Sequence, residues 1–455
     1  MKVIIIGAGQ IGVALAKYLR QEDHSVVLID NCSEHLLHLA EQLDIQTIVG
    51  SGSSPSVLQR AGASDTDLLL AVTGSDEINI IACSLAKTLF QIPKRIARLT
   101  SPEYMEEKNA EFLRSLAIDV VVSPELETAR RVLADLSING AMDVTSFCEQ
   151  KVQFVGLKCR KNCALIGKTV SQIKDLLGMV NFSIVAIRRK NQLVDIKETS
   201  IRAGDDVYFF VASGHLERVL DIFGYTKNMP DNVLIFGGGQ IGWALASLIE
   251  KPINRQNVMI IEKSDERATF LASHLRDSVI IKADGFDDRL LDEVDFKNYD
   301  IAVATTEKDE NNVLLSLLAK RNGIARSCAL IRNKLYNNYI GGLGIDSFIN
   351  PNAVMVSAIL QHMRKGRVQD GYFLQSGLGE LLQIEVLHTS KITKAPLENI
   401  KVPKGIVLGG FMRKGVFMCP DKNLIVQEGD IAFIFVESGH VTDAEKLFRV
   451  ELSFF

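Results

Sequence analysis

Two glycine-rich motifs are candidate phosphate-binding loops. Each has the spacing Gly-x-Gly-x-x-Gly, follows a short apolar run and precedes a stretch with helical spacing. In such a loop the first glycine permits a tight turn, the second lets a pyrophosphate approach the backbone, and the third allows close helix–strand packing. The helix that follows offers free N–H groups and a partial positive charge to an anion. The residues of the motifs are Gly7, Ala8, Gly9, Gln10, Ile11 and Gly12, and Gly237, Gly238, Gly239, Gln240, Ile241 and Gly242.

An acidic residue ends the second apolar run after each motif. This residue is Asp30 in the first case and Glu262 in the second. A carboxylate at this place accepts hydrogen bonds from the hydroxyls of an adenosine ribose and would repel a 2′-phosphate. No arginine follows immediately, so the residues favour NAD or ATP/ADP over NADP. We therefore expect an adenine nucleotide at each glycine loop.

The chain is an internal duplication. The resemblance between its halves extends past the glycine motifs, since Thr73 to Asn79 returns as Thr306 to Asn312. A second kind of segment also recurs: residues 203–205 and 211–215 return as 428–430 and 436–440. The order is therefore A–B–A′–B′. We expect domains at residues 1–142, 143–228, 229–370 and 371–455.

Segment A reads as alternating strands and helices. A continuous apolar run that ends in glycine suits a strand buried on both faces. Six such strands with intervening helices indicate a doubly wound parallel sheet, whereas B reads as a small α+β module with strands near 152–157, 184–188 and 207–211. The predicted fold class is thus α/β, with two Rossmann domains each followed by a small α+β domain. The strands expected in A are 3–6, 26–29, 47–49, 68–72, 96–99 and 120–122.

Composition excludes several classes of protein. The chain has 455 residues, of which 51 are basic and 55 acidic, and its net charge of −4 gives no electrostatic case for nucleic acid. The longest apolar runs are far below the about 20 residues needed to span a bilayer. The amino terminus lacks the apolar segment of a signal peptide. We expect a protein with no transmembrane segment of its own, located in the cytoplasm.

The sequence gives little support for a catalytic or metal site. Ser213 and His215 could be nucleophile and base, but a helix start is the better interpretation, so no catalytic residue is expected. The cysteines are odd in number and do not suggest a disulfide framework. Cys159 and Cys163 are interpreted as two reduced thiols rather than half of a zinc site, and no metal site is expected.

The sequence resembles the TrkA family, the peripheral regulatory subunits of bacterial Trk potassium uptake systems, across essentially its whole length. Such subunits carry two tandem regulator-of-conductance-of-K⁺ (RCK) units. Besides the glycine motifs, the resemblance rests on residues 71–77, 95–98, 101–104, 357–366, 428–430 and 441–448.

The resemblance implies a function that is not enzymatic. Such subunits form a homo-oligomeric ring on the cytoplasmic face of the inner membrane, bind NAD(H) and ATP/ADP, and gate a membrane-embedded K⁺-translocating partner. By this analogy both glycine motifs line a pyrophosphate, and Asp30 and Glu262 hold a ribose. Thr73, Gly74 and Arg98 complete the first site, and Thr306 completes the second. The alternatives are an NAD-dependent oxidoreductase and a soluble nucleotide sensor without a transporter partner.

The two repeats differ at two places near the expected phosphates. The first has residues 50–52 as Gly-Ser-Gly where the second has Asp284 in an Ala-Asp-Gly sequence, so only the second offers a carboxylate there. Aligning the repeats places Leu330 opposite Arg98, which would remove a cation from the second site. We therefore expect the first site to hold the more highly charged phosphates.

Overall fold

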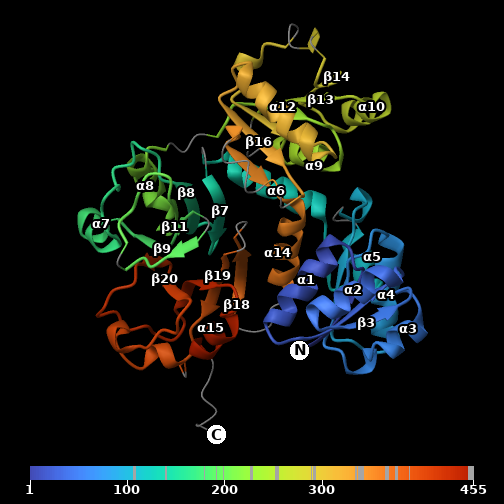
Figure 1. The fold of residues 1–455 in the computed structure, drawn as a ribbon, viewed down its shortest axis with the longest axis horizontal. Coiled ribbons are helices and arrows are strands. Elements are labelled where there is room, and N and C mark those ends of the chain that lie inside the picture. Colours follow the sequence, from blue (N-terminus) through green and yellow to red (C-terminus); the bar gives the residue numbers. More distant parts are fainter. Residues whose placement is uncertain are drawn as a thin grey trace. The chain divides into compact units, whose positions relative to one another are not determined.

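The computed structural model divides the chain into two compact units. The first comprises Met1–Thr128 and Pro351–Arg364, and the second comprises Ala129–Asn350 and Lys365–Phe455. Element labels follow Figure 1. Residues 364–366, the end of one motif of the family resemblance, lie outside the described residues. Those described are 1–105, 109–138, 141–178, 180–190, 192–197, 199–225, 229–251, 256–287, 289–290, 294–333, 336, 343–363, 368–374, 378–388 and 390–448.

The first unit contains a parallel sheet of six strands in the order β3-β2-β1-β4-β5-β6. Its central strands are apolar runs, and Ile4, Ile5 and Leu70 have no exposed surface. The strand order reverses between β1 and β4, which is where ligands bind in open sheets of this kind. The strands are β1 (Lys2–Ile6), β2 (Ser25–Asp30), β3 (Gln46–Val49), β4 (Leu68–Ala71), β5 (Lys94–Arg98) and β6 (Val120–Val122).

Helices of both repeats pack on this first sheet. Helix α14 (Pro351–Met363) comes from the second repeat, yet it packs against α1 and β6. Figure 1 shows it as an orange helix beside the blue α1. The first unit is therefore completed by a segment more than two domains away in sequence. The helices of the first repeat are α1 (Gln10–Gln21), α2 (Ser33–Leu43), α3 (Pro55–Arg60), α4 (Asp76–Thr88) and α5 (Ala110–Ser115).

The second unit contains a second parallel sheet with the same topology, in the order β14-β13-β12-β15-β16-β17. Its strands are β12 (Asn232–Phe236), β13 (Asn257–Glu262), β14 (Val279–Lys282), β15 (Ile301–Ala304), β16 (Arg326–Leu330) and β17 (Ser347–Ile349). Its helices include α9 (Gln240–Ile249), α10 (Asp265–His274) and α12 (Asp309–Arg321). The predicted duplication of the Rossmann domain is confirmed.

Each small domain is an antiparallel five-stranded sheet with helices. The sheets are β10-β9-β11-β8-β7 and β18-β19-β22-β20-β21, which is one topology used twice. Aromatic side chains on the two sheets share one core, where Phe154, Phe210 and Phe433 pack together. The first sheet contains β7 (Ala141–Phe147), β8 (Val152–Lys158), β9 (Phe182–Arg189), β10 (Gln192–Val194) and β11 (Asp206–Ala212), with helices α7 (Val170–Leu177) and α8 (Leu216–Phe223). The second contains β18 (Val368–Phe373), β19 (Gly379–Glu385), β20 (Ile406–Arg413), β21 (Val416–Met418) and β22 (Ile431–Glu437), with helix α15 (Val441–Phe448).

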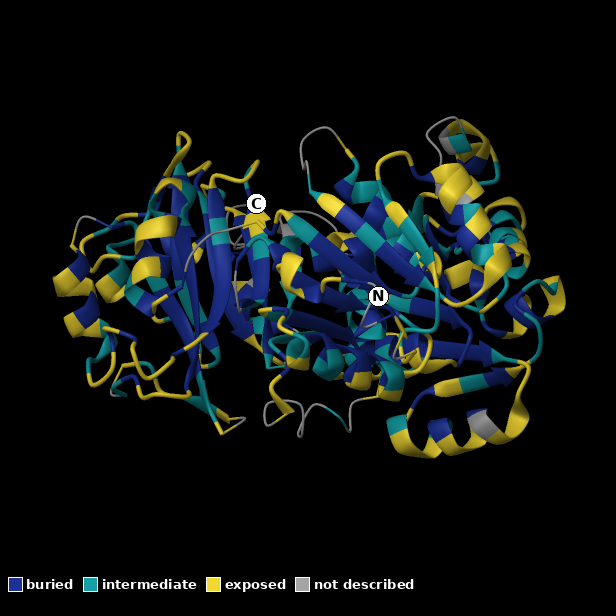
Figure 2. Cartoon of the chain, turned by 90° about the horizontal axis from the view of Figure 1, so that it is seen from above, coloured by how far each residue is buried: buried dark blue, intermediate teal, exposed yellow. Residues whose placement is uncertain are grey.

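The predicted fold class is confirmed, and the structure adds strands that the sequence did not predict. Strands β7 and β10 flank the three expected in the first small domain. Strand β7 crosses the expected boundary between residues 142 and 143, and β18 crosses the one between 370 and 371. Figure 2 shows why the central strands were easier to predict from the sequence: they are buried along their length, whereas the helices expose one face.

Charged residues are buried where helix α6 (Pro124–Leu136) meets β7 and β16 in the second unit. Arg131 Nε donates to Asp135 Oδ1 at 3.0 Å, and Arg131 Nη2 donates to Asp143 Oδ1 at 3.2 Å. The three residues are each 8% exposed or less. From β16, Arg326 Nη2 donates to the Leu136 carbonyl at 3.3 Å. Burial of the carboxyl raises the pKa of Asp135 to about 7 although Arg131 opposes this shift.

Candidate nucleotide-binding sites

The first glycine loop has the geometry of a phosphate-binding turn. Gly7 has φ of +106°, and a Cβ at this position would stand 3.0 Å from the Thr73 nitrogen. A Cβ on Gly12 would stand only 1.8 Å from the Gly7 carbonyl oxygen, so only glycine fits there. Around Gly9, by contrast, no heavy atom lies within 4 Å of the position of a Cβ. The loop is thus closed at its first and third glycines and open at the second, where an anion would approach.

Helix α1 presents its amino terminus at this opening. Its N-cap residue is Gly9, and no side chain caps the helix. Gln10 and Ile11 form its first turn, in which the backbone N–H groups have no earlier helical partner. The helix dipole adds a partial positive charge. These are the elements from which an oxyanion site at a helix terminus is made.

Asp30 is fixed at the carboxyl end of β2 beside the loop. Its Oδ2 accepts a hydrogen bond from the Ala8 N–H at 2.6 Å, and its Oδ1 accepts one from the Cys32 N–H at 2.9 Å. Each carboxylate oxygen can accept further hydrogen bonds. The backbone therefore orients the carboxylate while leaving it able to accept bonds from ribose hydroxyls.

The loop after β4 is held by a buried asparagine that the sequence analysis did not single out. Asn79 has no exposed surface, and its Oδ1 accepts hydrogen bonds from the Thr73 N–H at 3.0 Å and hydroxyl at 2.7 Å. Its Nδ2 donates to the carbonyls of Thr73 and Arg98. One side chain thus ties the ends of β4 and β5 together. Its recurrence as Asn312 in the duplicated segment was the signal that could have identified it.

Arg98 lies at the end of β5 near carboxylates of the same unit. Its Nε is buried and has no hydrogen-bond partner among the described residues. Its positive charge acts on Glu125, at the start of α6, whose pKa is raised by burial and partly restored by the Ser123 hydroxyl and Arg98. Arg98 as a whole is partly exposed, so its guanidinium can contact a phosphate at this edge of the sheet. A Cβ on Gly74, in the neighbouring loop, would have no heavy atom within 4 Å.

Gln10 also contacts the second repeat within the first unit. Asn352, in the first turn of α14, donates through Nδ2 to Gln10 Oε1 at 2.5 Å. At the other end of α14, Lys94 Nζ donates to the His362 carbonyl. A residue of the first glycine motif is therefore in contact with a helix that belongs to the other repeat.

The second glycine loop reproduces this geometry. Gly237 has φ of +97°, and a Cβ on Gly242 would stand 2.1 Å from the Gly237 carbonyl oxygen. Glu262 accepts hydrogen bonds from the Gly238 N–H and the Ser264 N–H, both at 2.7 Å. The helix start is again free of a side-chain cap, since Gly239 is the N-cap of α9 and is followed by Gln240 and Ile241.

The two loops differ at the residue after the first glycine, and this difference matches the different lengths of the two acidic side chains. Glutamate is one methylene longer than aspartate, so Glu262 needs more room than Asp30. The position of Ala8 is glycine in the second loop, where a Cβ on Gly238 would stand 2.2 Å from Leu271 Cδ1 and 3.3 Å from Glu262 Oε2. The smaller loop residue thus accompanies the longer acid.

The loop after β15 is anchored as in the first unit. Asn312 Oδ1 accepts from the Thr306 N–H at 2.8 Å and hydroxyl at 2.6 Å, and its Nδ2 donates to the Leu330 carbonyl at 2.8 Å. This places Leu330 opposite Arg98, as the aligned repeats indicated. Asp284, however, is paired with Lys263 at 2.7 Å, which together with the Phe286 N–H lowers its pKa.

Two arginines near the second loop were missed by the sequence analysis. Arg267 donates through Nε to the Gly238 carbonyl at 2.6 Å, and its guanidinium lies 4.4 Å from the Phe270 ring centroid. Arg332 stands two residues after Leu330 and donates through Nη1 to the Glu307 carbonyl at 3.0 Å. The second site therefore has arginines nearby although Leu330 replaces Arg98, and the expectation that the first site holds the more highly charged phosphates stays a prediction.

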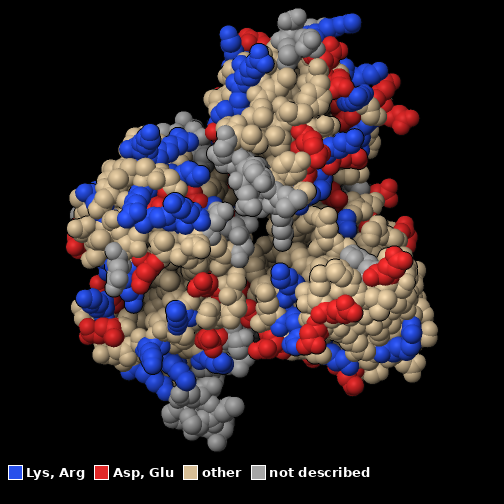
Figure 3. All heavy atoms as spheres, viewed as in Figure 1, with Lys and Arg blue, Asp and Glu red and all other residues tan. Residues whose placement is uncertain are grey.

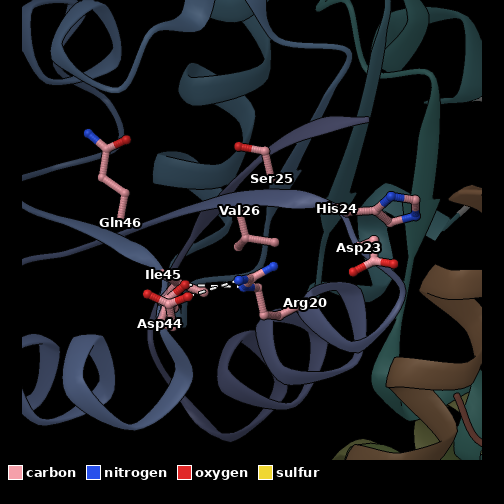
Figure 4. Close-up of a pocket in the computed structure, with 8 residues that line it drawn as sticks. All are labelled: Arg20, Asp23, His24, Ser25, Val26, Asp44, Ile45 and Gln46. Atoms are coloured by element: carbon pink, nitrogen blue, oxygen red, sulfur yellow. Dashed lines mark hydrogen bonds and ion pairs between the residues drawn. The ribbon is translucent and has the colours of Figure 1, made fainter.

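A cavity of about 360 Å³ lies elsewhere on the first Rossmann domain. It is at the amino-terminal ends of β2 and β3, whereas the glycine loop is at the carboxyl end of β1 (Figure 4). Arg20 and Asp44 form an ion pair of 2.8 Å at its wall. None of the predicted nucleotide-binding residues lines it. The residues that do are Arg20, Asp23, His24, Ser25, Val26, Asp44, Ile45 and Gln46.

Comparison with known proteins identifies the family. A family model for the TrkA-N domain matches residues 3–124 and 233–351, and one for the TrkA-C domain matches residues 155–224. The Trk system potassium uptake protein TrkA of Azorhizobium caulinodans is 36% identical to this chain over 458 residues, which cover 100% of both proteins. The chain belongs to the TrkA family. The predicted class, a potassium-uptake regulatory subunit and not an enzyme, is confirmed, and the oxidoreductase alternative is set aside.

Solved structures share the TrkA-like tandem fold. The GsuK channel bound to NAD has a TM-score of 0.59 at 18% identity, covering 98% of this chain and 78% of the channel chain. GsuK bound to ADP has a TM-score of 0.50 at 16% identity, covering 80% and 70%. Identities this low show the fold alone.

Three further observations bear on possible partners and ligands. No helix in the described part of the chain combines the length and apolar character needed to cross a membrane. On the face drawn in Figure 3, basic and acidic side chains are interspersed. Among the described residues, no group of three or more His, Cys, Asp or Glu side chains could hold a metal ion.

Proposed function

We propose that each glycine loop of this chain binds an adenine nucleotide, NAD(H) or ATP/ADP. The pyrophosphate would lie on the helix amino termini at Gly9 and Gly239, and the ribose hydroxyls would bind Asp30 and Glu262. Thr73, Gly74 and Arg98 would border the first nucleotide. Thr306, Asp284 and Arg332 would border the second. NAD and ADP are the ligands of the two GsuK structures with this fold, which supports the choice of nucleotide.

One observation carries this proposal. In both repeats a carboxylate at the end of the second strand accepts the N–H of the residue after the first glycine, at 2.6 Å in one and 2.7 Å in the other. The second glycine is open to solvent and the helix behind it is uncapped in both. A glycine-rich turn with only a structural role would need neither the oriented carboxylate nor the open side.

The chain would act by converting nucleotide binding into a change of a membrane-embedded K⁺-translocating partner. Such coupling requires that a nucleotide bind two arrangements of the protein with different affinity. We infer a homo-oligomeric ring on the cytoplasmic face of the inner membrane, as the family resemblance implies. Because Asn352 of α14 donates a hydrogen bond to Gln10, a ligand that moves the first loop would act directly on a helix of the second repeat.

Calorimetric titration tests the nucleotide sites. NADH, ATP and ADP are titrated separately into the full chain and into Asp30→Asn and Glu262→Gln. Each amide has the length of the acid that it replaces and keeps a hydrogen-bond acceptor, but it removes the negative charge. Asp175→Asn, on the exposed face of α7, is the matched control for loss of one carboxylate.

We expect each substitution to weaken nucleotide binding only at its own loop. The affinity should fall about tenfold or more, because a charged hydrogen bond to the ribose is lost. The control should bind as the unaltered chain does. Unchanged binding in both loop variants would refute the assignment of the sites. Copurification of a multi-span membrane protein with the tagged chain from detergent extracts tests the partner. Its absence, with nucleotide binding intact, would favour a sensor that has no transporter.

A further inference from the structure

One edge of the first small domain carries a group of basic side chains that the nucleotide sites do not use. The sequence has no Asp or Glu from residue 157 to residue 174. Two backbone hydrogen bonds join this segment to the turn before β11: the Gly204 N–H donates to the Cys159 carbonyl at 2.7 Å, and the Ile201 N–H donates to the Lys168 carbonyl at 3.0 Å. We call the basic residues that these bonds bring together the basic edge. Its members are Lys158, Arg160, Lys161, Lys168 and Arg202.

The carboxylates next to the basic edge are already paired with other arginines. Asp205 accepts hydrogen bonds from Arg189 Nε at 2.8 Å and Nη2 at 2.7 Å, and Asp206 accepts one from Arg188 Nε at 2.8 Å. Within the described part of the chain, no carboxylate forms an ion pair with a member of the basic edge. Lys168 is half-buried and the other four members are exposed. The edge therefore presents its positive charge to the surroundings.

The second small domain shows that the fold does not require this charge. Val386 makes the same two backbone bonds with its Gly-Asp turn as Cys159 does, at 2.8 and 2.9 Å. Gln427 donates its N–H to the aspartate of that turn as Arg202 does, at 2.8 Å in both domains. These bonds align the two edges, and the residues at the places of Lys158, Arg160 and Arg202 are Glu385, Leu387 and Gln427. The same turn is thus built without the cations, so the positive charge of the first domain has a role other than folding.

An exposed apolar side chain lies in the same loop as the basic edge. Ile166, between Lys161 and Lys168, is 38% exposed. The Arg160 guanidinium lies 4.4 Å from the centroid of the Tyr225 ring, a contact that orients this cation. Figure 3 shows basic side chains gathered over the visible face of the first small domain. Cations with an apolar side chain among them suit the surface of an anionic bilayer, where headgroup phosphates attract the cations and the apolar group enters the interface.

We propose that the basic edge binds the headgroups of anionic phospholipids and holds the first small domain at a membrane surface. This contact goes beyond the proposed action on a K⁺-translocating partner, because it needs no membrane protein. The attraction of an anionic surface falls off within a Debye length, about 8 Å at physiological ionic strength. The cations must therefore reach the headgroups themselves, which the exposed members of the edge can do.

Flotation of the purified full chain with protein-free vesicles tests the proposal. Vesicles of phosphatidylcholine alone are compared with vesicles of phosphatidylcholine and phosphatidylglycerol in equal parts. We expect the chain to float only with the vesicles that contain phosphatidylglycerol, and high salt to release it because salt screens the attraction. Equal flotation with both compositions, or with neither, would overturn the proposal. So would binding to soluble polyglutamate without binding to the vesicles, which would assign the edge to an acidic protein.

The matched variant gives the first small domain the side chains of the second. Vesicle binding should fall about 100-fold or more, because each lost cation contributes about fivefold. The control makes the same change of charge at exposed lysines of the second small domain and should bind as the unaltered chain does. Circular dichroism melts check that both variants fold, and an equal loss of binding in both would show that only net charge matters and contradict the assignment to this edge. The variant combines Lys158→Glu, Arg160→Leu and Arg202→Gln, and the control combines Lys401→Glu, Lys404→Leu and Lys422→Gln.

Discussion

Replacing Asp135 by asparagine should remove a pH dependence that this one carboxyl imposes on the second unit. Asp135 is 4% exposed and faces Arg131 on its own helix, Asp143 on β7 and Arg326 on β16. Burial raises its pKa from the ordinary 3.8 to about 7. Between these pH values the folded chain binds one proton more than the unfolded chain. Stability therefore falls as the pH rises through 7, and the contribution is complete only below about 4.

The magnitude follows from the shift. Each pKa unit corresponds to about 1.4 kcal/mol, so ionising Asp135 in the folded chain costs about 4 kcal/mol in full. Between pH 5 and pH 8 the loss is about 3 kcal/mol, because part of the effect already lies below pH 5. Asparagine resembles the protonated acid and leaves Arg131 paired with Asp143. Between pH 5 and pH 8, the free energy of unfolding should therefore fall by about 3 kcal/mol less in Asp135→Asn than in the unaltered chain.

The sole tryptophan provides the assay. Trp243 lies in α9 of the second Rossmann domain, so its fluorescence follows urea unfolding of the unit that contains Asp135. Unfolding free energies are compared at pH 5 and pH 8 for the unaltered chain, Asp135→Asn and the exposed control Asp175→Asn. Effects of titratable groups that do not face Asp135 cancel in the difference between variants. A difference that changes by less than about 1 kcal/mol would mean that Arg131 and Arg326 keep Asp135 ionised throughout, and the reasoning would fail.

Two further predictions concern the glycine loops. Gly12→Ala should abolish nucleotide binding at the first loop and destabilise its domain by about 1–3 kcal/mol, because the added Cβ would overlap the Gly7 carbonyl oxygen. Gly9→Ala should fold normally and should weaken only nucleotide binding, since its Cβ would meet no other atom. Circular dichroism melts and NADH titration separate these outcomes, and equal melting temperatures would contradict the first. Asn79→Ala should cost about 2–4 kcal/mol, since several buried groups lose their partners, and should weaken only the first site, while Asn312→Ala should weaken only the second. Equal effects of the two variants on both sites would refute the local role of these asparagines.

The strands of the Rossmann domains could be predicted because each is a buried apolar run. The expected strand at residues 68–72 is observed as Leu68–Ala71, and that at 120–122 is observed unchanged. Strand β7 was missed for a physical reason. Its Asp143 interrupts the apolar pattern, and the buried Arg131 on α6 together with the Tyr372 hydroxyl makes that charge compatible with a core strand.

The packing of α14 against the first repeat could not be predicted from local patterns. Its residues have helical spacing and apolar character, which indicate that the helix is buried but not which elements it packs against. Contact with α1 joins segments more than 300 residues apart. The predicted site residues stay predictions, although the structure brings each set together around an open loop. Arg332 was missed because aligning the repeats residue by residue does not show that a cation two positions later reaches the same edge.

The duplication separates what nucleotide binding needs from what makes each site individual. Both repeats keep two sterically required glycines, a carboxylate bound to a loop amide, and a buried asparagine between two strands. Parts that recur in this detail have one physical task in both halves. The positions that differ, such as Arg98 against Leu330 and Ala8 against Gly238, are then the places where the halves diverged. Substituting one half's residue into the other therefore tests whether these positions decide which nucleotide each proposed site binds.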